Sequence, residues 1–255
     1  SEIRLRGHAI EARLCTEDPA RDFRPSAGRI VHFEPAEAEA LRIESGVETG
    51  SEVPPFYDSM VAKLIASGPD RETARQRLVD GLRRTVLAGP VTNARFLVAL
   101  LEDKGVRAAR MDTGLIGREI GRLTEAPVAR PVVELAALHL VEAARARGLA
   151  ARSAHSGGWP SPWDAGDGFQ LGGERRQSVK IMANGAPATV DVWWRPEGPV
   201  VPVAASNHPP GEADTPEAAV IEDGDRVLVI ADLVQTEVAW PTYDPSSVEV
   251  DGGGT

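Results

Sequence analysis

Near the start of the chain, apolar and polar residues alternate, a pattern that few kinds of local structure accommodate. Between residues 3 and 14, Ala12 and Leu14 fall on one side and Arg13 on the other. A side-chain period of two predicts a β-strand with one buried face, which places Arg13 on the polar side of a sheet. Two more short strands are expected at residues 29–33 and 41–47.

A helical period replaces the alternation further along the chain. Asp70 is a candidate N-cap, and the apolar residues after it recur every four positions as far as Val86. Gly89-Pro90 predicts the end of this helix. Two later helices are expected, one capped by Thr92 and a short one from Asp112 or Thr113 to about Ile120. Strands followed by helices predict an α+β unit over residues 1–122.

The second half of the chain has a different pattern. After a linker at residues 123–131, the stretch 132–149 predicts a helix that is apolar on most faces, as expected of a helix enclosed by other structure. Short strands with a period of two are expected at residues 178–182, 188–194, 226–231 and 236–240. Together they predict a helix enclosed by an antiparallel β-barrel over residues 132–250, followed by a linker at 251–255.

Composition excludes several classes of function. A net charge of −10 argues against binding a phosphate backbone as the main task, so no nucleic acid is expected as a partner. No apolar run approaches the roughly 20 residues that cross a membrane. The single cysteine, Cys15, excludes an intrachain disulfide and is in keeping with a reducing cytoplasm. No metal-ligand spacing and no phosphate-binding loop is found, so no metal site is expected.

Two places in the first half suggest chemistry. Arg13 offers a permanent positive charge that suits a carboxylate, bicarbonate or enolate, although a strand arginine paired with Glu11 is the commoner outcome. Tyr57 and Asp58 follow a rigid Pro54-Pro55 pair. Asp58 could orient an arginine or a substrate nitrogen, or with Ser59 it could simply cap the segment that follows. The residue pattern alone favours the structural alternative at both places.

The motifs of the first half also stand in a familiar order. They are Gly7-His8-Ala9-Ile10-Glu11-Ala12-Arg13-Leu14, Glu17-Asp18-Pro19, Phe23-Arg24-Pro25-Ser26-Ala27-Gly28-Arg29-Ile30, Val53–Met60 with Lys63-Leu64-Ile65, and Thr92-Asn93. Over residues 3–121 this order resembles the biotin carboxylase C-terminal domain. The second half resembles, more loosely, the BT domain of acyl-CoA carboxylase α-subunits, through Pro162-Trp163-Asp164, the stretch 168–173 and the glycine-rich end.

This resemblance implies roles for individual residues. Arg13 takes the place of the catalytic arginine that stabilises the biotin enolate, a delocalised anion suited to a fixed guanidinium. Tyr57 and Asp58 take the places of residues on the floor of the biotin and bicarbonate pocket. Arg42 falls at a homodimer-interface arginine. Thr113 stands where the family has an apolar residue beside the adenine.

The resemblance also implies a whole activity. The chain is expected to be part of an acyl-CoA carboxylase α-subunit, a ligase that carboxylates biotin from ATP, Mg²⁺ and bicarbonate and docks the carboxyltransferase β-subunit through its BT domain. The methylcrotonyl-type substrate is favoured, and propionyl, acetyl and geranyl remain open. The ATP-grasp domain and the biotin carrier are expected outside residues 1–255, so this chain alone is expected to be inactive. The alternative is a non-catalytic scaffold that reuses these folds.

Overall fold

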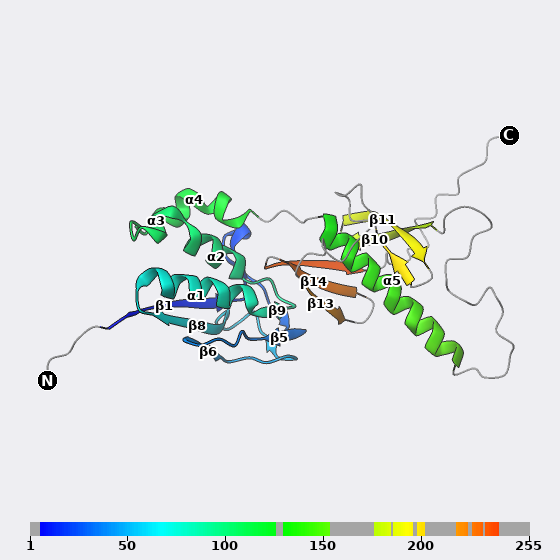
Figure 1. Cartoon of the computed structure of the whole chain (residues 1–255), viewed down its shortest axis with the longest axis horizontal. Coiled ribbons are helices and arrows are strands. Elements are labelled where there is room, and N and C mark those ends of the chain that lie inside the picture. Colours follow the sequence, from blue (N-terminus) through cyan, green and yellow to red (C-terminus); the bar gives the residue numbers. More distant parts are fainter. Residues whose placement is uncertain are drawn as a thin grey trace. The chain divides into compact units, whose positions relative to one another are not determined.

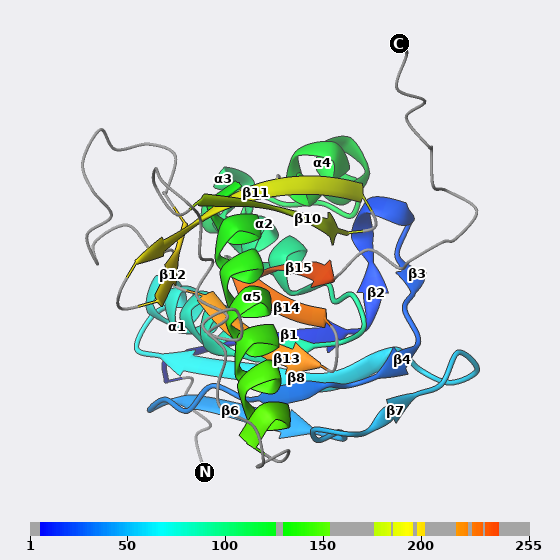
Figure 2. The ribbon, with the colours of Figure 1, turned by 90° about the vertical axis from the view of Figure 1, so that its right-hand side faces the viewer.

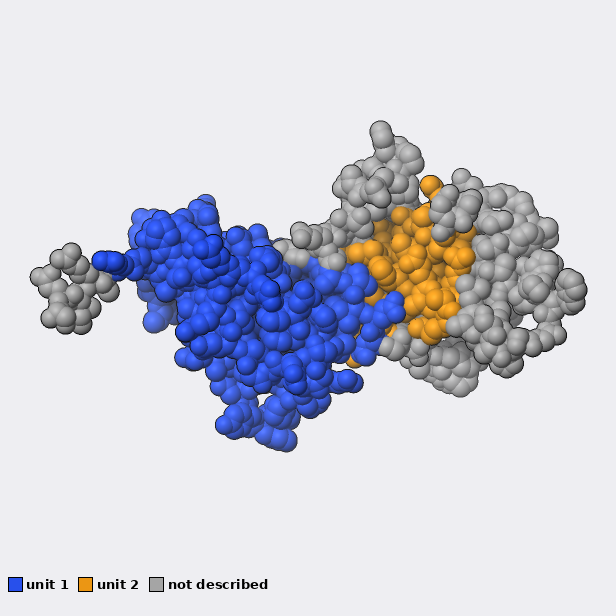
Figure 3. All heavy atoms as spheres, turned by 60° about the horizontal axis from the view of Figure 1, so that its bottom comes forward, with its two compact units in different colours: residues 1–129, 216–223, 228–235 blue, residues 130–215, 224–227, 236–255 orange. Residues whose placement is uncertain are grey.

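The computed structural model describes residues 6–125, 130–153, 176–184, 186–195, 198–201, 218–223, 226–231 and 233–239 (Figure 1). The motifs at residues 162–164 and 168–173 and the expected linker at 251–255 lie outside the described residues. The chain forms two compact units, which Figure 3 colours separately. The first contains residues 1–129, 216–223 and 228–235, and the second contains residues 130–215, 224–227 and 236–255.

A three-stranded antiparallel sheet lies at the centre of the first unit. Its order is β1 (His8–Cys15), β8 (Met60–Gly68) and β6 (Leu41–Ser45) (Figure 2). The strand predicted from the alternation at residues 3–14 is confirmed over His8–Cys15, as is the one at 41–47 over its first five residues. The middle strand, β8, was not predicted.

The register of this sheet separates an apolar face from a polar face. Ala12 pairs with Leu64, which pairs with Ile43, and this row belongs to the hydrophobic core. Arg13 pairs with Lys63, which pairs with Glu44 on the other side. Paired residues of adjacent strands project to the same face, so Arg13 lies on the polar face of the sheet.

Helix α1 (Arg71–Arg84) packs against the apolar face, where its Leu78 and Leu82 join the core cluster. Asp70 is its N-cap, as predicted, because the carboxylate accepts a hydrogen bond from the backbone N–H of Thr73 at 2.8 Å. The predicted extension of this helix to Gly89-Pro90 is wrong. The helix ends at Arg84, and the next residues form β9 (Val86–Ala88), which pairs with β5 (His32–Glu34).

The later helices also differ in detail from the predictions. Helix α2 (Ala94–Glu102) begins after Asn93 rather than after Thr92, and α4 (Leu115–Thr124) begins two to three residues beyond the expected start. A one-turn helix, α3 (Lys104–Arg107), was not predicted. Short elements complete the unit: β2 (Glu17–Asp18), η1 (Pro19–Arg21), β3 (Arg24–Pro25), β4 (Gly28–Arg29) and β7 (Glu52–Val53). The predicted strand at 29–33 is therefore split between β4 and β5.

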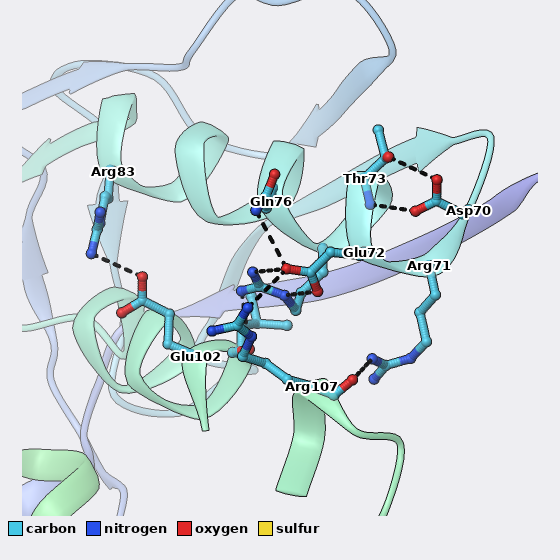
Figure 4. Close-up of polar contacts among 10 residues, drawn as sticks. Asp70, Arg71, Glu72, Thr73, Gln76, Arg83, Glu102 and Arg107 are labelled. Carbon is cyan, nitrogen blue, oxygen red and sulfur yellow. Dashed lines mark hydrogen bonds and ion pairs between the residues drawn. The ribbon is translucent and has the colours of Figure 1, made fainter. Parts of the chain in front are cut away.

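A charged network joins α1 to the segments after it (Figure 4). The buried Arg75 donates two hydrogen bonds to the Glu72 carboxylate, at 2.8 and 2.7 Å, and a third to the Leu101 carbonyl at 3.3 Å. Arg107 reaches the same carboxylate at 3.3 Å. The network therefore links α1 to α2 through Arg75 and to α3 through the Glu72 carboxylate.

The second unit is built on a long helix, α5 (Arg130–Ser153), which confirms the helix predicted at 132–149. The helix contacts β10 (Arg176–Ala183), β11 (Ala186–Arg195) and β12 (Gly198–Val200). The remaining strands are β13 (Ala218–Asp223), β14 (Arg226–Ala231) and β15 (Val234–Ala239); the division between the two units runs through the last two.

The described strands do not form the expected barrel. Strand β12 has β11 as its one neighbour within the described residues, so the sheet that contains it has an open edge. Among the described strands, α5 packs on β10, β11 and β12. None of the described helices is long and apolar enough to cross a membrane.

Candidate functional site

Arg13 lies near the end of β1, on the polar face of the three-stranded sheet. Its Nε atom lies 3.8 Å from Glu11 Oε1, and the two side chains are 68% and 43% exposed. The pairing expected as the structural alternative therefore exists, but an ion pair this long and this exposed contributes little to stability. The guanidinium remains accessible to an anion from solution.

The segment after β1 is joined to the turn that carries Tyr57 and Asp58. The backbone N–H of Thr16 donates to the Ser59 carbonyl at 2.8 Å, and the Thr16 hydroxyl donates to the same oxygen at 3.2 Å. The Ser59 hydroxyl in turn donates to Glu17 Oε2 at 3.5 Å. The sequence regions of Arg13 and Asp58 are thus brought together.

Within that turn, the Asp58 carboxylate accepts a hydrogen bond from the backbone N–H of Met60 at 3.1 Å. This is the capping alternative, and no ion pair between Asp58 and Arg13 is present among the described residues. Phe56 is 94% exposed and Tyr57 is 85% exposed. Both aromatic side chains, which precede Asp58 in the sequence, are therefore open to solvent.

The charges of Arg13, Glu17 and Asp58 all influence the pKa of the Cys15 thiol. Burial raises the pKa of the Cys15 thiol above its usual 9.0, and the Glu17 carboxylate raises it further. A hydrogen bond with Ser59 and the charge of Arg13 act in the opposite direction. The thiol is therefore protonated at neutral pH, which argues against a nucleophilic role.

The other two predicted site residues lie elsewhere in the first unit. Arg42 is on β6, the edge strand on the far side of β8 from Arg13, where its Nη2 lies 3.4 Å from Glu44 Oε1. It is an exposed arginine on a sheet edge. Thr113 is exposed in the loop before α4, next to the ion pair between Asp112 and Arg118.

The contacts made by two residues of this region, Glu17 and Asn93, were not predicted from the sequence. Glu17 links Ser59 to Asn93, and Asn93 contacts both Arg13 and Cys15. Only the three-dimensional fold brings these residues together, since Asn93 is 80 positions from Arg13. No group of three acidic, histidine or cysteine side chains suited to a metal ion occurs in the described part of the chain.

The accessible Arg13 guanidinium fits the binding of a small anion. The described residues do not by themselves fit a magnesium site, which takes oxygen ligands from carboxylates, phosphates and water. The chemistry available to this face is therefore stabilisation of negative charge.

Comparisons with known proteins agree with this fold. A family model for the biotin carboxylase C-terminal domain matches residues 11–118. Biotin carboxylase from Nostoc sp. is 40% identical over 115 residues, which cover 45% of this chain and 26% of that protein. The mitochondrial methylcrotonoyl-CoA carboxylase subunit alpha of Dictyostelium discoideum is 31% identical over 194 residues, which cover 75% of this chain and 27% of that protein.

Among solved structures, complete multifunctional pyruvate carboxylase from Rhizobium etli matches 55% of this chain and 13% of its own length, with 28% identity and a TM-score of 0.51. The chain spans about a quarter of the length of the two curated relatives. The matched residues contain the three-stranded sheet, α1 to α3 and the Arg13 region. Residues 11–118 of this chain form a biotin carboxylase C-terminal domain.

Proposed function

We propose that the chain supplies the C-terminal domain of a biotin carboxylase, in which Arg13 stabilises negative charge that develops on the substrate. ATP, Mg²⁺ and bicarbonate supply the activated carboxyl group in such an enzyme, and biotin accepts it. The observation that carries the proposal is the position of Arg13, which is exposed on β1 within the matched residues. A guanidinium held on a strand costs little reorganisation when charge appears nearby.

Tyr57 and Asp58 complete the proposed pocket on the biotin and bicarbonate side. Their turn is hydrogen-bonded to the segment after Arg13, which supports a shared site. Asp58 is held by a hydrogen bond from the backbone N–H of Met60, which fixes its carboxylate within this turn. Thr113 is assigned beside the nucleotide, and Arg42 to a homodimer interface at the edge of the sheet.

The proposal extends to an acyl-CoA carboxylase α-subunit of the methylcrotonyl type. The match to the Dictyostelium methylcrotonoyl-CoA carboxylase subunit covers 194 residues, more than the first unit contains before residue 129, so it reaches into the second unit. Residues 132–250 are then a BT domain that docks the carboxyltransferase β-subunit. Co-elution of this chain with that β-subunit tests the docking role, and separate elution at micromolar concentration contradicts it.

The catalytic proposal is tested in the carboxylase α-subunit in which this chain stands. Carboxylation of free biotin and bicarbonate-dependent hydrolysis of ATP are measured for wild type and for Arg13→Ala. We expect kcat for biotin carboxylation to fall about 100- to 1,000-fold, the usual effect of removing one charge-stabilising donor, while ATP hydrolysis continues.

Arg21→Ala is the matched control, since Arg21 is also an exposed arginine of this domain and pairs only loosely, at 3.5 Å, with Asp18. It should leave both rates unchanged. An Arg13→Ala enzyme that carboxylates biotin at the wild-type rate would refute the assignment.

A further inference from the structure

Asn93 occupies the N-cap position of α2 but does not cap the helix. Its backbone angles are φ −84° and ψ 8°, and its side chain makes no capping hydrogen bond. Asparagine at an N-cap ordinarily accepts a hydrogen bond from one of the first free N–H groups of the helix. Here the side chain is only 5% exposed and is directed to another part of the fold. Its amide therefore serves something other than the helix.

The amide spans the end of β1. Asn93 Oδ1 accepts a hydrogen bond from the backbone N–H of Cys15 at 3.0 Å, and Nδ2 donates to the Arg13 carbonyl at 3.2 Å. The backbone N–H of Asn93 adds a third bond, to the Cys15 carbonyl at 3.1 Å. One side chain thus holds the peptide groups on both sides of Leu14.

These bonds lie where β1 loses its regular pairing. The register between β1 and β8 shifts between Leu14 and Cys15, so the regular ladder extends to Leu14 and is interrupted before Cys15. Irregularities of this kind redirect side chains and need other partners for the displaced backbone groups. Asn93 bonds the Arg13 carbonyl and the Cys15 N–H directly beside this irregularity.

The same amide reaches the Asp58 turn. Asn93 Nδ2 lies 3.3 Å from Glu17 Oε1, and Glu17 Oε2 accepts a hydrogen bond from the Ser59 hydroxyl at 3.5 Å. A chain of polar contacts therefore runs from the Arg13 carbonyl through Asn93 and Glu17 to Ser59, the neighbour of Asp58. The position requires a donor and an acceptor on one short side chain, which an amide has and a carboxylate lacks.

We propose that Asn93 is a positioning residue for Arg13, which holds the strand end beneath the guanidinium in register with the Asp58 turn. The inference rests on the proposed function of Arg13 as the charge-stabilising group. Because displacement of a catalytic group by about 1 Å can reduce the rate about 100-fold, a residue that sets the backbone on both sides of Leu14 controls the activity of the group beside it.

The first test uses the 255-residue chain itself and needs no substrate. Cys15 is its only cysteine and is half-buried, so the rate of modification by a thiol reagent reports how far this strand end exposes the thiol. In Asn93→Ala, loss of the hydrogen bonds to the strand end should raise the labelling rate about tenfold. Thr92→Ala is the matched control because Thr92 Oγ1 contacts only the start of α2, at Ala94 N, and it should leave the rate unchanged.

Asn93→Asp provides a second, isosteric variant. Its new carboxylate keeps an acceptor for Cys15 N–H but places an oxygen against the Arg13 carbonyl and the Glu17 carboxylate. Protonation of the new carboxylate restores a donor. The ratio of the variant's labelling rate to that of the wild type should therefore fall toward 1 as the pH is lowered. Thermal melting of each variant shows that the domain remains folded. Equal labelling of wild type and both Asn93 variants at neutral pH would overturn the inference.

The second test compares the rates of biotin carboxylation and of ATP hydrolysis in the carboxylase α-subunit. Asn93→Ala should lower kcat for biotin carboxylation about 100-fold while bicarbonate-dependent ATP hydrolysis continues, as in Arg13→Ala. A merely structural role would lower both rates together, and that result overturns the inference. If Arg13→Ala does not lower the rate of biotin carboxylation more than the rate of ATP hydrolysis, the proposed function of Arg13 fails instead. The two failures are therefore distinguishable.

Discussion

The side chain of Gln235 gives a prediction that can be worked out from the structure in some detail. Its Oε1 accepts a hydrogen bond from the backbone N–H of Gly89 at 2.9 Å, and its Nε2 donates to the Gly89 carbonyl at 3.1 Å. The amide thus bonds both backbone polar groups of a residue 146 positions away, as a neighbouring strand would. Gly89 has φ +126°, and an added Cβ there would lie 2.3 Å from the Arg29 carbonyl, so this backbone has no easy alternative conformation.

Gln235→Ala removes both bonds and leaves a partly buried donor and acceptor without their partner. At about 1 kcal/mol net for each hydrogen bond, the free energy of unfolding of the first unit should fall by about 2 kcal/mol. The loss is measured by urea denaturation followed by far-UV circular dichroism. Glu222→Ala, at an exposed position of β13 in the same unit, is the control and should change stability by less than about 0.5 kcal/mol.

Gln235→Glu can keep one of the two hydrogen bonds and removes the other. The new carboxylate can accept from Gly89 N–H, but its second oxygen faces the Gly89 carbonyl unless it is protonated. The pKa of the new carboxyl is therefore raised in the folded state, and its contribution to stability is present at low pH and lost as the pH rises through that pKa. A Gln235→Ala chain as stable as wild type, or a Gln235→Glu chain with no such pH dependence, would show that the contact does not support the fold.

Two other perturbations test the packing of the first unit. The hydrogen bonds from Arg75 lower the pKa of Glu72 from 4.5 to about 2. The contribution of Glu72 to stability is therefore present above pH 4.5 and lost as the pH falls toward 2. Glu72→Gln should lower the urea midpoint at pH 7 and make the midpoint depend less on pH in the acid range. Leu64→Ala, at a fully buried position of β8, should lower the free energy of unfolding by roughly 2–5 kcal/mol in the same denaturation assay, and a smaller loss would mean that β8 is not the centre of the core.

Local signals in the sequence predicted the elements whose cause is itself local. The Asp70 cap depends on a hydrogen bond to a residue three positions away, and the alternation around Arg13 depends on which face of one strand is buried. Both can therefore be recognised without knowing the rest of the fold. The long helix of the second unit was predicted for a similar reason, since its apolar residues repeat over many turns.

The errors occur where a distant partner decides the structure. Val86 continues the four-residue spacing of α1, but it pairs in β9 with Glu34, a residue 52 positions earlier. In β8 the alternation is broken because Val61 and Ala62 are both buried and Lys63 follows them. A central strand packed on one face by a helix and flanked by two strands has this mixed pattern, which the period alone does not distinguish from a loop or a helix.

Arg13 shows why the sequence supported two opposite interpretations of the same residue. Spacing predicted a pairing with Glu11, and the structure contains that pairing, with both side chains well exposed. The pairing and the catalytic role are compatible, because a weak ion pair leaves the guanidinium free to exchange Glu11 for a stronger anion. What a catalytic arginine requires in addition is a backbone that does not move when the partner changes. Contacts from residues 16, 59 and 93, rather than from Glu11, hold the backbone of this region, so the neighbours that suit Arg13 to its proposed role are those that its local sequence does not reveal.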